Sequence, residues 1–595
     1  MFIFPSSKVK SPKKSRTVGY KYRPLFLIFL LSLILFGGIG SRLFFLQIKQ
    51  GKENVQKAEN NRIRILPKPP VRGNIFDSKG KILATTKLSR ALYVWPKIQK
   101  DPDWLGIRHR LAEILNLSEE QVQIELEKAG YDSPTLLRLA RNLTVEQVTA
   151  LEEYRPELKG IEIDIETIRY YPYQATASHI LGYTGELNQA QLAKKRSEGY
   201  RLGDVMGKMG IEESLESLLR GEWGGIQLEV DGAGRVRKII GQKDAKAGQD
   251  VTLTLDLELQ KVAEKALGER KGAIVALDPR TGAVLAMVSY PRFDPNIFSA
   301  PITTEVWRKL QGKGNPFVNR AIRGFPPAST FKIVTAAAGM ETGKYPPNTI
   351  LPTYAYLNVG GTRFGEWNRA GFGPMGYVQA LAWSSNTFHG QIGRGIGGEA
   401  LIAWARKFGF GQKTGIELSG ELPGLIADDA WKRRNFKNWG WTEGDTINMS
   451  IGQGFTQATP LQVAVMFAIA GNGGYKVKPH LLLQAQEDAL AERVSLNLKS
   501  STIKTLKQGL RAVVTSGTGK ALNVATIPSA AGKSGTAEAP PGKVHTWFGG
   551  FAPYDNPEIV VVAFGEHTGG GGGSVAGPMV RQVMEAYFAQ KNKKP

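Results

Sequence analysis

A long apolar run near the start of the chain constrains the fold more than any other feature. From Pro24 to Ser41 there is no charged residue, and after Arg42 the apolar character resumes through Ile48. As a helix, a segment of this length crosses a hydrocarbon layer of ~30 Å. The sequence therefore predicts one membrane anchor over residues 24–48.

The residues that flank this run favour an uncleaved anchor. The first 23 positions hold seven Lys or Arg residues and no acid, which predicts a cytoplasmic basic tail over 1–23. A cleaved signal peptide is the alternative, but its apolar core usually spans about 7 to 15 residues. No small-x-small cleavage site follows the run before Gln47-Ile48-Lys49. We therefore expect the chain after about residue 49 to be exported.

Composition limits the chemistry of the exported part. The chain has no cysteine, which excludes disulfides, thiolate nucleophiles and cysteine-ligated zinc. Its six histidines show no HExxH or clustered spacing, so we expect no metal site and no cofactor. The net charge of +24 suits nucleic acid, an anionic membrane surface or an acidic polymer. The basic tail beside the apolar run favours the membrane.

The exported part divides into two predicted domains. Residues 49–250 alternate short β-rich runs with polar helical stretches and hold no dense catalytic cluster, which predicts a pedestal domain. After that the pattern changes: two runs joined by Asp278-Pro-Arg-Thr-Gly282 predict a β-hairpin by alternation and turn chemistry. We predict a C-terminal domain over 251–590 that closes with a helix, and a disordered basic tail over 591–595.

One Ser-x-x-Lys pattern has the context of a catalytic pair. Three residues along a helix place the lysine on the same face as the serine, about one ~5.4 Å turn away. Alone the pattern is not specific, because it occurs at Ser7, Ser11, Ser78, Ser329 and Ser501.

Ser329 differs from the other four serines in its surroundings. It precedes an apolar stretch and so lies at a helix N-terminus, where free N–H groups favour a developing oxyanion. Lys332 lies one turn in among apolar residues, where loss of solvation favours a neutral base. Ser78 falls in a turn beside Gly80, and Ser501 opens a helix whose lysine faces solvent.

Two further motifs follow in the order that acyl transfer requires. Ser384-Ser-Asn386 supplies a second hydroxyl and an amide. Lys533-Ser534-Gly535, followed by Thr536, supplies a cation and hydroxyls for a substrate carboxylate, and its glycine lets a substrate backbone approach a strand edge. Lys413-Thr-Gly415 is a decoy, because strand character flanks only the motif at Lys533.

Together the three motifs resemble those of the penicillin-binding proteins and serine β-lactamases. Further segments resemble class B penicillin-binding proteins, and within them the branch of penicillin-binding protein 2, over essentially the whole chain. These segments are Arg72–Asp77, His179–Tyr183, Gly210–Glu213, Leu219–Gly221, Gly444–Asn448, Ile451–Gly454 and Thr459–Gln462.

The resemblance implies an α/β (α+β) transpeptidase fold, in which an antiparallel sheet is flanked by helices and mounted on an elongated, dimerisation-type pedestal. It also implies roles for the motif residues. Ser329 is then the acylated nucleophile, Lys332 the base and Ser384 the proton relay. Asn386 and Lys533 hold substrate, Ser534 and Thr536 contact its carboxylate, and the N–H groups of Ser329 and Thr536 form the oxyanion hole.

The implied function is a peptidoglycan D,D-transpeptidase of the bacterial inner membrane that acts in wall elongation and cell shape and binds penicillin covalently. Implied partners are stem peptides, lipid-linked glycan strands, β-lactams, a RodA-type glycosyltransferase and other elongation-complex membrane proteins; nucleic acid is not among them. A D,D-carboxypeptidase or antibiotic-hydrolysing enzyme shares the acylation step, so the motifs leave it open. A β-lactam sensor or scaffold is a third alternative, which the intact motif set disfavours.

Overall fold

The computed structural model describes residues 23–52, 63–130, 136–201, 203–230, 236–299, 302, 304–312, 314–437 and 439–592. They form two compact units: Met1–Pro69 with Glu222–Lys246, and Pro70–Gly221 with Ala247–Pro595. The domain boundary near residue 250 stays a prediction, because the second unit contains residues from both sides of it. Most of the predicted cytoplasmic tail, including Ser7 and Ser11, lies outside the described residues.

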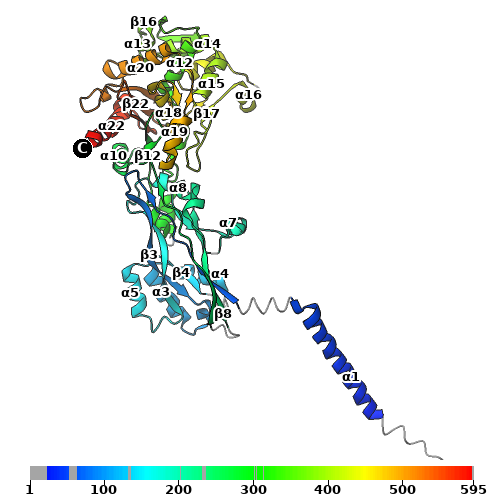
Figure 1. Cartoon of the computed structure of the whole chain (residues 1–595). Coiled ribbons are helices and arrows are strands. Elements are labelled where there is room, and N and C mark those ends of the chain that lie inside the picture. The colour runs from blue at the N-terminus through cyan, green and yellow to red at the C-terminus, as the bar shows by residue number, and fades with distance from the viewer. Residues whose placement is uncertain are drawn as a thin grey trace, which may run out of the picture. The chain divides into compact units, whose positions relative to one another are not determined.

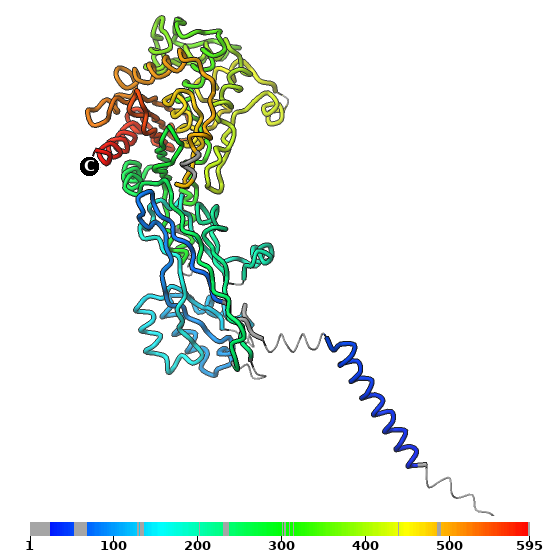
Figure 2. Tube along the Cα trace, in the orientation of Figure 1, coloured from blue at the N-terminus to red at the C-terminus, as the bar shows by residue number. Residues whose placement is uncertain are grey.

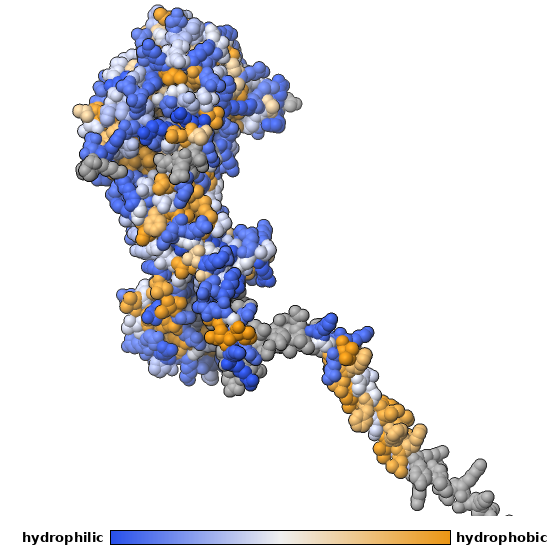
Figure 3. Space-filling view, in the orientation of Figure 1, coloured by the Kyte–Doolittle hydropathy of each residue, from blue (hydrophilic) through white to orange (hydrophobic). Residues whose placement is uncertain are grey.

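The first unit contains the predicted anchor. Helix α1 (Arg23–Phe44) continues into the π-helical turn η1 (Phe45–Lys49), and among the described residues this is the one helix long and apolar enough to cross a membrane. Its apolar side chains are exposed, with Leu31 at 72%, and its surface is hydrophobic in Figure 3. The unit also holds the antiparallel sheet β1-β8-β9, formed by Ile63–Lys68, Gly224–Val230 and Val236–Lys243.

The second unit begins with a sheet that joins strands of the predicted pedestal to β10, at the start of the predicted C-terminal domain. Its order is β10-β2-β3-β4, with β5 also paired to β3. Strand β10 runs parallel to β2, with Val251 opposite Ile75, so that segments far apart in the sequence lie side by side (Figure 2). The strands are β2 (Ile75–Phe76), β3 (Ile82–Val94), β4 (Leu137–Ala140), β5 (Ile161–Tyr170) and β10 (Val251–Thr252).

Three helices complete a separate apolar core against β3 and β4. They are α3 (Trp104–Leu115), α4 (Glu119–Ala129) and α5 (Val145–Glu153). The N-terminus of α4 is capped by Ser118, whose hydroxyl accepts from the Gln121 N–H at 3.1 Å. This capping box satisfies N–H groups that the first helical turn leaves unpaired.

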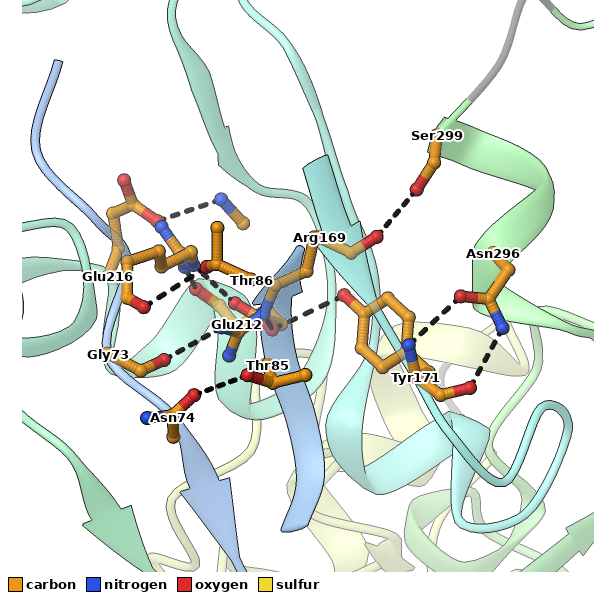
Figure 4. Close-up of polar contacts among 12 residues, drawn as sticks. Gly73, Asn74, Thr85, Thr86, Arg169, Tyr171, Glu212, Glu216, Asn296 and Ser299 are labelled. Atoms are coloured by element: carbon orange, nitrogen blue, oxygen red, sulfur yellow. Dashed lines mark hydrogen bonds and ion pairs between the residues drawn. The ribbon is translucent and has the colours of Figure 1, made fainter. Parts of the chain in front are cut away.

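A buried ion-pair network holds the start of the second unit together (Figure 4). Glu212 is fully buried and accepts from Arg72 Nε and Arg169 Nε, each at 2.6 Å. Arg72 also pairs with Glu216 at 2.7 Å. Two guanidinium groups therefore offset the cost of burying the Glu212 carboxylate.

The same network reaches a loop of the predicted C-terminal domain (Figure 4). Asn296 exchanges two hydrogen bonds of 2.9 Å with the backbone of Tyr171. Ser299 Oγ donates to the carbonyl of Arg169 at 2.8 Å. Residues 169–171 therefore connect the ion pairs directly to the segment that contains η4 (Pro295–Ser299).

A second five-stranded antiparallel sheet carries the C-terminal part of this unit, in the order β12-β11-β23-β22-β21. The predicted hairpin is confirmed by the pairing of β11 with β12. Both faces of β11 are buried, because helices cover the sheet on both sides. The strands are β11 (Gly272–Leu277), β12 (Val284–Tyr290), β21 (Ala531–Ala537), β22 (His545–Ala552) and β23 (Ile559–Gly565).

Helices α10 (Leu257–Leu267) and α22 (Gly577–Asn592) pack on one face of this sheet (Figure 1). Helix α18 (Pro460–Gly471) packs on the other face, where every one of its residues is buried. The predicted class, an antiparallel sheet flanked by helices, is confirmed. The predicted tail over 591–595 needs one correction: Lys591 and Asn592 belong to α22, and Lys591 pairs with Glu558 at 2.5 Å.

Short elements join these layers around the site. They are η6 (Ala328–Phe331), α12 (Lys332–Glu341), β13 (Ile350–Thr353), β14 (Tyr356–Val359), β15 (Thr362–Gly365), β16 (Gly373–Gly376), α13 (Tyr377–Ala382), α14 (Asn386–Ile396), α15 (Gly398–Lys407), α17 (Glu443–Ser450) and α20 (Ser500–Thr515).

Candidate active site

Ser329 lies in a short 3-10 turn, η6, that leads directly into helix α12. The residue before it, Ala328, has a φ of +51°, a left-handed conformation that is unusual for a side chain other than glycine. The Ala328 N–H donates to the carbonyl of Gly452 at 2.9 Å, which holds this strained residue in place. The strain therefore lies immediately beside the predicted nucleophile.

Lys332 is the first residue of α12 and is completely buried. Its Nζ donates to the Ser384 carbonyl and to Asn386 Oδ1, both at 2.7 Å. A third contact, at 3.3 Å, joins Nζ to Ser384 Oγ. The first two motifs are therefore connected through the side chain of Lys332.

Ser384 lies in the sharp turn between helices α13 and α14. Its φ is +58°, so a second left-handed residue occurs at the site. Ser385 then caps α14, because its hydroxyl accepts from the Phe388 N–H at 3.2 Å. The turn presents Ser384 Oγ to two lysines, and Asn386 begins the helix beside it.

Lys533 comes from β21, the edge strand of the central sheet, and is completely buried. Its Nζ donates to Ser384 Oγ and to the Ser534 carbonyl, both at 2.9 Å. Gly535 follows where the strand approaches η6, and a Cβ there would lie 3.3 Å from the Pro327 carbonyl. Glycine therefore lets the third motif approach the first closely.

The two remaining hydroxyls of the third motif have partners outside the motifs. Ser534 Oγ and Thr518 Oγ1 are 2.7 Å apart. Thr536 is exposed, and its Oγ1 accepts from the Gly572 N–H at 3.1 Å. The structure therefore joins Lys332, Ser384, Asn386 and Lys533 by side-chain hydrogen bonds, whereas Ser534 and Thr536 extend the site toward other loops.

Burial lowers the pKa of Lys332 from its usual value to about 7, against the opposite effect of the Glu366 charge. Burial also lowers the pKa of Lys533, and the nearby ammonium of Lys332 acts in the same direction. Both effects disfavour the charged form of a lysine. A neutral amine at this site is therefore accessible near neutral pH.

A neutral Lys332 has two N–H groups and one lone pair. The Ser384 carbonyl and Asn386 Oδ1 accept its two N–H groups, so the lone pair is left for a hydroxyl. Ser384 Oγ accepts from Lys533 and can donate its own proton toward Lys332. The arrangement can accept a proton from a serine nucleophile and pass it along a hydroxyl.

The decoy motifs lie in other surroundings. Lys413 belongs to a segment without strand structure, where Thr414 Oγ1 donates to Glu421 at 2.6 Å. Lys504, the partner of Ser501 in its Ser-x-x-Lys pattern, is exposed on α20. Lys413 therefore lies outside strand structure and Lys504 faces solvent, as the sequence predicted; that neither lysine belongs to the site stays a prediction.

Two residues at the site, Glu366 and Thr518, were not predicted from the sequence. Glu366 is buried and accepts hydrogen bonds from the start of α14, and Thr518 contacts Ser534. Thr518 follows helix α20 within Ser516-Gly-Thr-Gly519, a turn-like signal that could have found it. Glu366 follows β15 with no such signal.

In the part of the chain that the structure describes, no group of three His, Asp or Glu could hold a metal ion.

Comparisons with known proteins show the family of this chain. Residues 272–585 match the penicillin binding protein transpeptidase domain, and residues 67–253 match the penicillin-binding protein dimerisation domain. The peptidoglycan D,D-transpeptidase MrdA of Haemophilus influenzae is 34% identical over 99% of this chain and 95% of its own length.

Solved structures agree as well. A complex between penicillin-binding protein PBP2 and MreC from Helicobacter pylori matches with a TM-score of 0.79 and 27% identity, covering 89% of this chain and 100% of that one. A structure described as coordinating polymerization and crosslinking in a peptidoglycan synthase complex matches with a TM-score of 0.69 and 33% identity, covering 96% and 98%. The chain therefore belongs to the class B penicillin-binding proteins, in the branch of the penicillin-binding protein 2 transpeptidases.

Proposed function

We propose that this chain cross-links peptidoglycan as a serine D,D-transpeptidase in wall elongation and cell-shape maintenance. Ser329 attacks the penultimate D-alanine carbonyl of a donor stem peptide, D-alanine leaves, and an amine of a second stem peptide takes the acyl group. The convergence of Lys332 and Lys533 on Ser384 Oγ carries the proposal. Relatives named peptidoglycan D,D-transpeptidases support it.

Each motif residue has a proposed role in this reaction. Lys332 takes the proton of Ser329, and Ser384 relays it to the departing D-alanine. Asn386 and Lys533 hold substrate, with Ser534 and Thr536 at its carboxylate. The N–H groups of Ser329 and Thr536 stabilise the oxyanion, in a strand-edge geometry that Gly535 permits.

We propose further that α1 anchors the protein in the bacterial inner membrane with its N-terminus in the cytoplasm and the catalytic part in the periplasm. The basic tail supports this orientation. A RodA-type glycosyltransferase is the proposed source of glycan strands, supported by the similarity to the synthase complex. An MreC-type protein is a second proposed partner, supported by the Helicobacter pylori complex.

A D,D-carboxypeptidase is the alternative function, because water can replace the amine after acylation. Labelling of the full-length protein with a fluorescent penicillin, followed by peptide mapping, tests the shared step. We expect one labelled peptide that contains Ser329; a label elsewhere, or none, would exclude both functions. Incubation with a donor peptide and an amine acceptor then separates them, since a transpeptidase forms the cross-linked product.

A further inference from the structure

A buried carboxylate lies beneath the second motif. Glu366 follows β15 and is 7% exposed. Its Oε1 accepts from the N–H groups of Trp367 and Asn386, both at 3.0 Å. Its Oε2 accepts from Ser385 Oγ at 2.6 Å, from the Thr387 N–H at 3.0 Å and from Thr387 Oγ1 at 3.1 Å. All of these partners are donors, and four of the contacts come from Ser385 to Thr387.

The residue before Glu366 fixes the side chain of Asn386. Asn386 Nδ2 donates to the Gly365 carbonyl at 3.0 Å, which leaves Oδ1 to accept from Lys332 Nζ at 2.7 Å. Glu366 and Gly365 therefore hold the backbone and the amide of Asn386 from one hairpin. The direction of a Lys332 N–H depends on that placement.

Glu366 also supplies negative charge near a cluster of basic groups. Lys332, from α12, faces Lys533 from β21 and His389 from α14, and all three are buried. Burial and the two lysine charges keep the pKa of His389 well below its usual range, which favours the neutral ring. The charge of Glu366 acts on Lys332 in the opposite sense from burial.

We propose that Glu366 is a positioning residue for acyl transfer, which acts through Asn386 and Lys332 without touching the substrate. Its carboxylate fixes the second motif against Lys332 and balances the charge of the buried lysines. This inference rests on the proposed function, in which Ser329 is acylated and Lys332 is the base. A carboxylate that only capped α14 would contribute to stability and leave the acylation plateau of the folded protein unchanged.

The chain offers a matched control at Glu421. This carboxylate is 4% exposed and accepts from the Thr414 N–H at 2.7 Å, from Thr414 Oγ1 at 2.6 Å and from the Gly415 N–H at 3.2 Å. It is therefore buried to a similar extent as Glu366 and has the same kind of partners. Its partners, Thr414 and Gly415, belong to the decoy motif at Lys413 and not to the three motifs of the proposed site.

The experiment compares wild-type, Glu366→Gln, Glu366→Asp and Glu421→Gln proteins, each full-length in detergent. The acylation rate with fluorescent penicillin is measured from pH 5 to 10. Hydrogen exchange of a peptide containing residues 384–388 is measured by mass spectrometry at one pH. The exchange readout does not depend on acylation.

Removal of the negative charge makes the ammonium form of Lys332 less stable, so the neutral base forms at lower pH. We expect Glu366→Gln to move the rising limb of the acylation profile to lower pH and to reduce its plateau by roughly 10- to 100-fold. Glu366→Asp keeps the charge, so its limb stays at the wild-type pH while its plateau falls. Both variants should exchange faster at 384–388, and Glu421→Gln should match wild type in both measurements.

An unshifted limb and an unchanged plateau in Glu366→Gln would overturn the proposal, as would unchanged exchange at 384–388. If Glu366→Gln does not fold, wild-type rate and exchange in Glu366→Asp would overturn it equally. A wild-type protein that is not acylated at all contradicts the proposed function instead. Exchange at 384–388 then still decides whether Glu366 holds the second motif.

Discussion

Lys332, from α12, and Lys533, from β21, donate to the same oxygen, Ser384 Oγ, at 3.3 and 2.9 Å. Two buried ammonium groups so close repel each other, so the pair holds one positive charge more readily than two. Burial lowers the pKa of both lysines, and the charge of Lys332 lowers that of Lys533 further. One lysine can then act as a base while the other stays a cation that holds a carboxylate.

Ser329→Ala should abolish penicillin labelling while the protein stays folded, because no other hydroxyl is proposed to form the acyl bond. Thermal denaturation of the full-length protein checks the fold, and gel fluorescence checks the label. Ser501→Ala, in an exposed Ser-x-x-Lys on α20, should label like wild type. Persistent labelling of Ser329→Ala would exclude Ser329 as nucleophile.

Lys533→Ala should lose most of the labelling, because it removes the donor to Ser384 Oγ and the cation that we propose for the substrate carboxylate. Lys413→Ala should keep it, since Lys413 lies in the loop that Glu421 holds. Labelling rates of the two purified variants at one penicillin concentration make the comparison. The reverse order of rates would assign the third motif to Lys413.

Glu212→Gln should destabilise the protein by about 3 kcal/mol or more, because Arg72 and Arg169 would stay buried without their shared carboxylate. Urea unfolding of the detergent-solubilised protein measures this loss. Glu258→Gln is the matched control, since its ion pair with Lys81 is about half exposed and such pairs contribute about 1 kcal/mol or less. Equal losses of unfolding free energy in the two variants would show that burial of the network adds nothing to the stability of the protein.

Acid should destabilise the protein through His179. Burial lowers the folded-state pKa of this ring to about 4, whereas an unfolded histidine titrates near ~6.5. The unfolded chain therefore binds the proton first, and stability falls as the pH drops from ~6.5 toward 4, by about 3 kcal/mol for this group. His179→Gln should lose less melting temperature between pH 7.5 and pH 5 than wild type; an equal loss would contradict the assignment.

The motifs were predictable because each is local. Where the segment is helical, a serine and a lysine three residues apart share a helix face, and Lys533 was chosen from the strand character of the segments after it. The apolar stretch after Ser329 then distinguished it from the other four serines, and the two later motifs follow in the expected order. The hairpin at β11 and β12 was predictable for the same reason, since its turn lies between its strands.

What the sequence did not predict depends on contacts between distant or unpatterned segments. Glu366 reaches the start of α14 from 20 residues away in the chain, and no periodicity marks it. The sequence places Lys591 in the basic tail, because its ion pair with Glu558 forms with a segment 33 residues earlier in the chain. Strand β10 pairs with β2, although most of the predicted pedestal lies between them in the chain. The compact units are therefore set by which strands pair in space and not by the order of the chain.

The proposed role of Lys332 as the base is tested by pH and by Lys332→Arg. The mechanism needs neutral Lys332, whose pKa burial lowers to about 7, so acylation of the wild type should rise with pH through that region and level off above it. A guanidinium stays charged throughout this range, so Lys332→Arg should fold, yet acylate slower by roughly 100-fold or more, with no rising limb near pH 7. Stopped-flow measurement of penicillin acylation from pH 5 to 9 gives both profiles. If Lys332→Arg kept the wild-type rate and limb, Lys332 would serve only as a charge, and the proton of Ser329 would have to leave through Ser384.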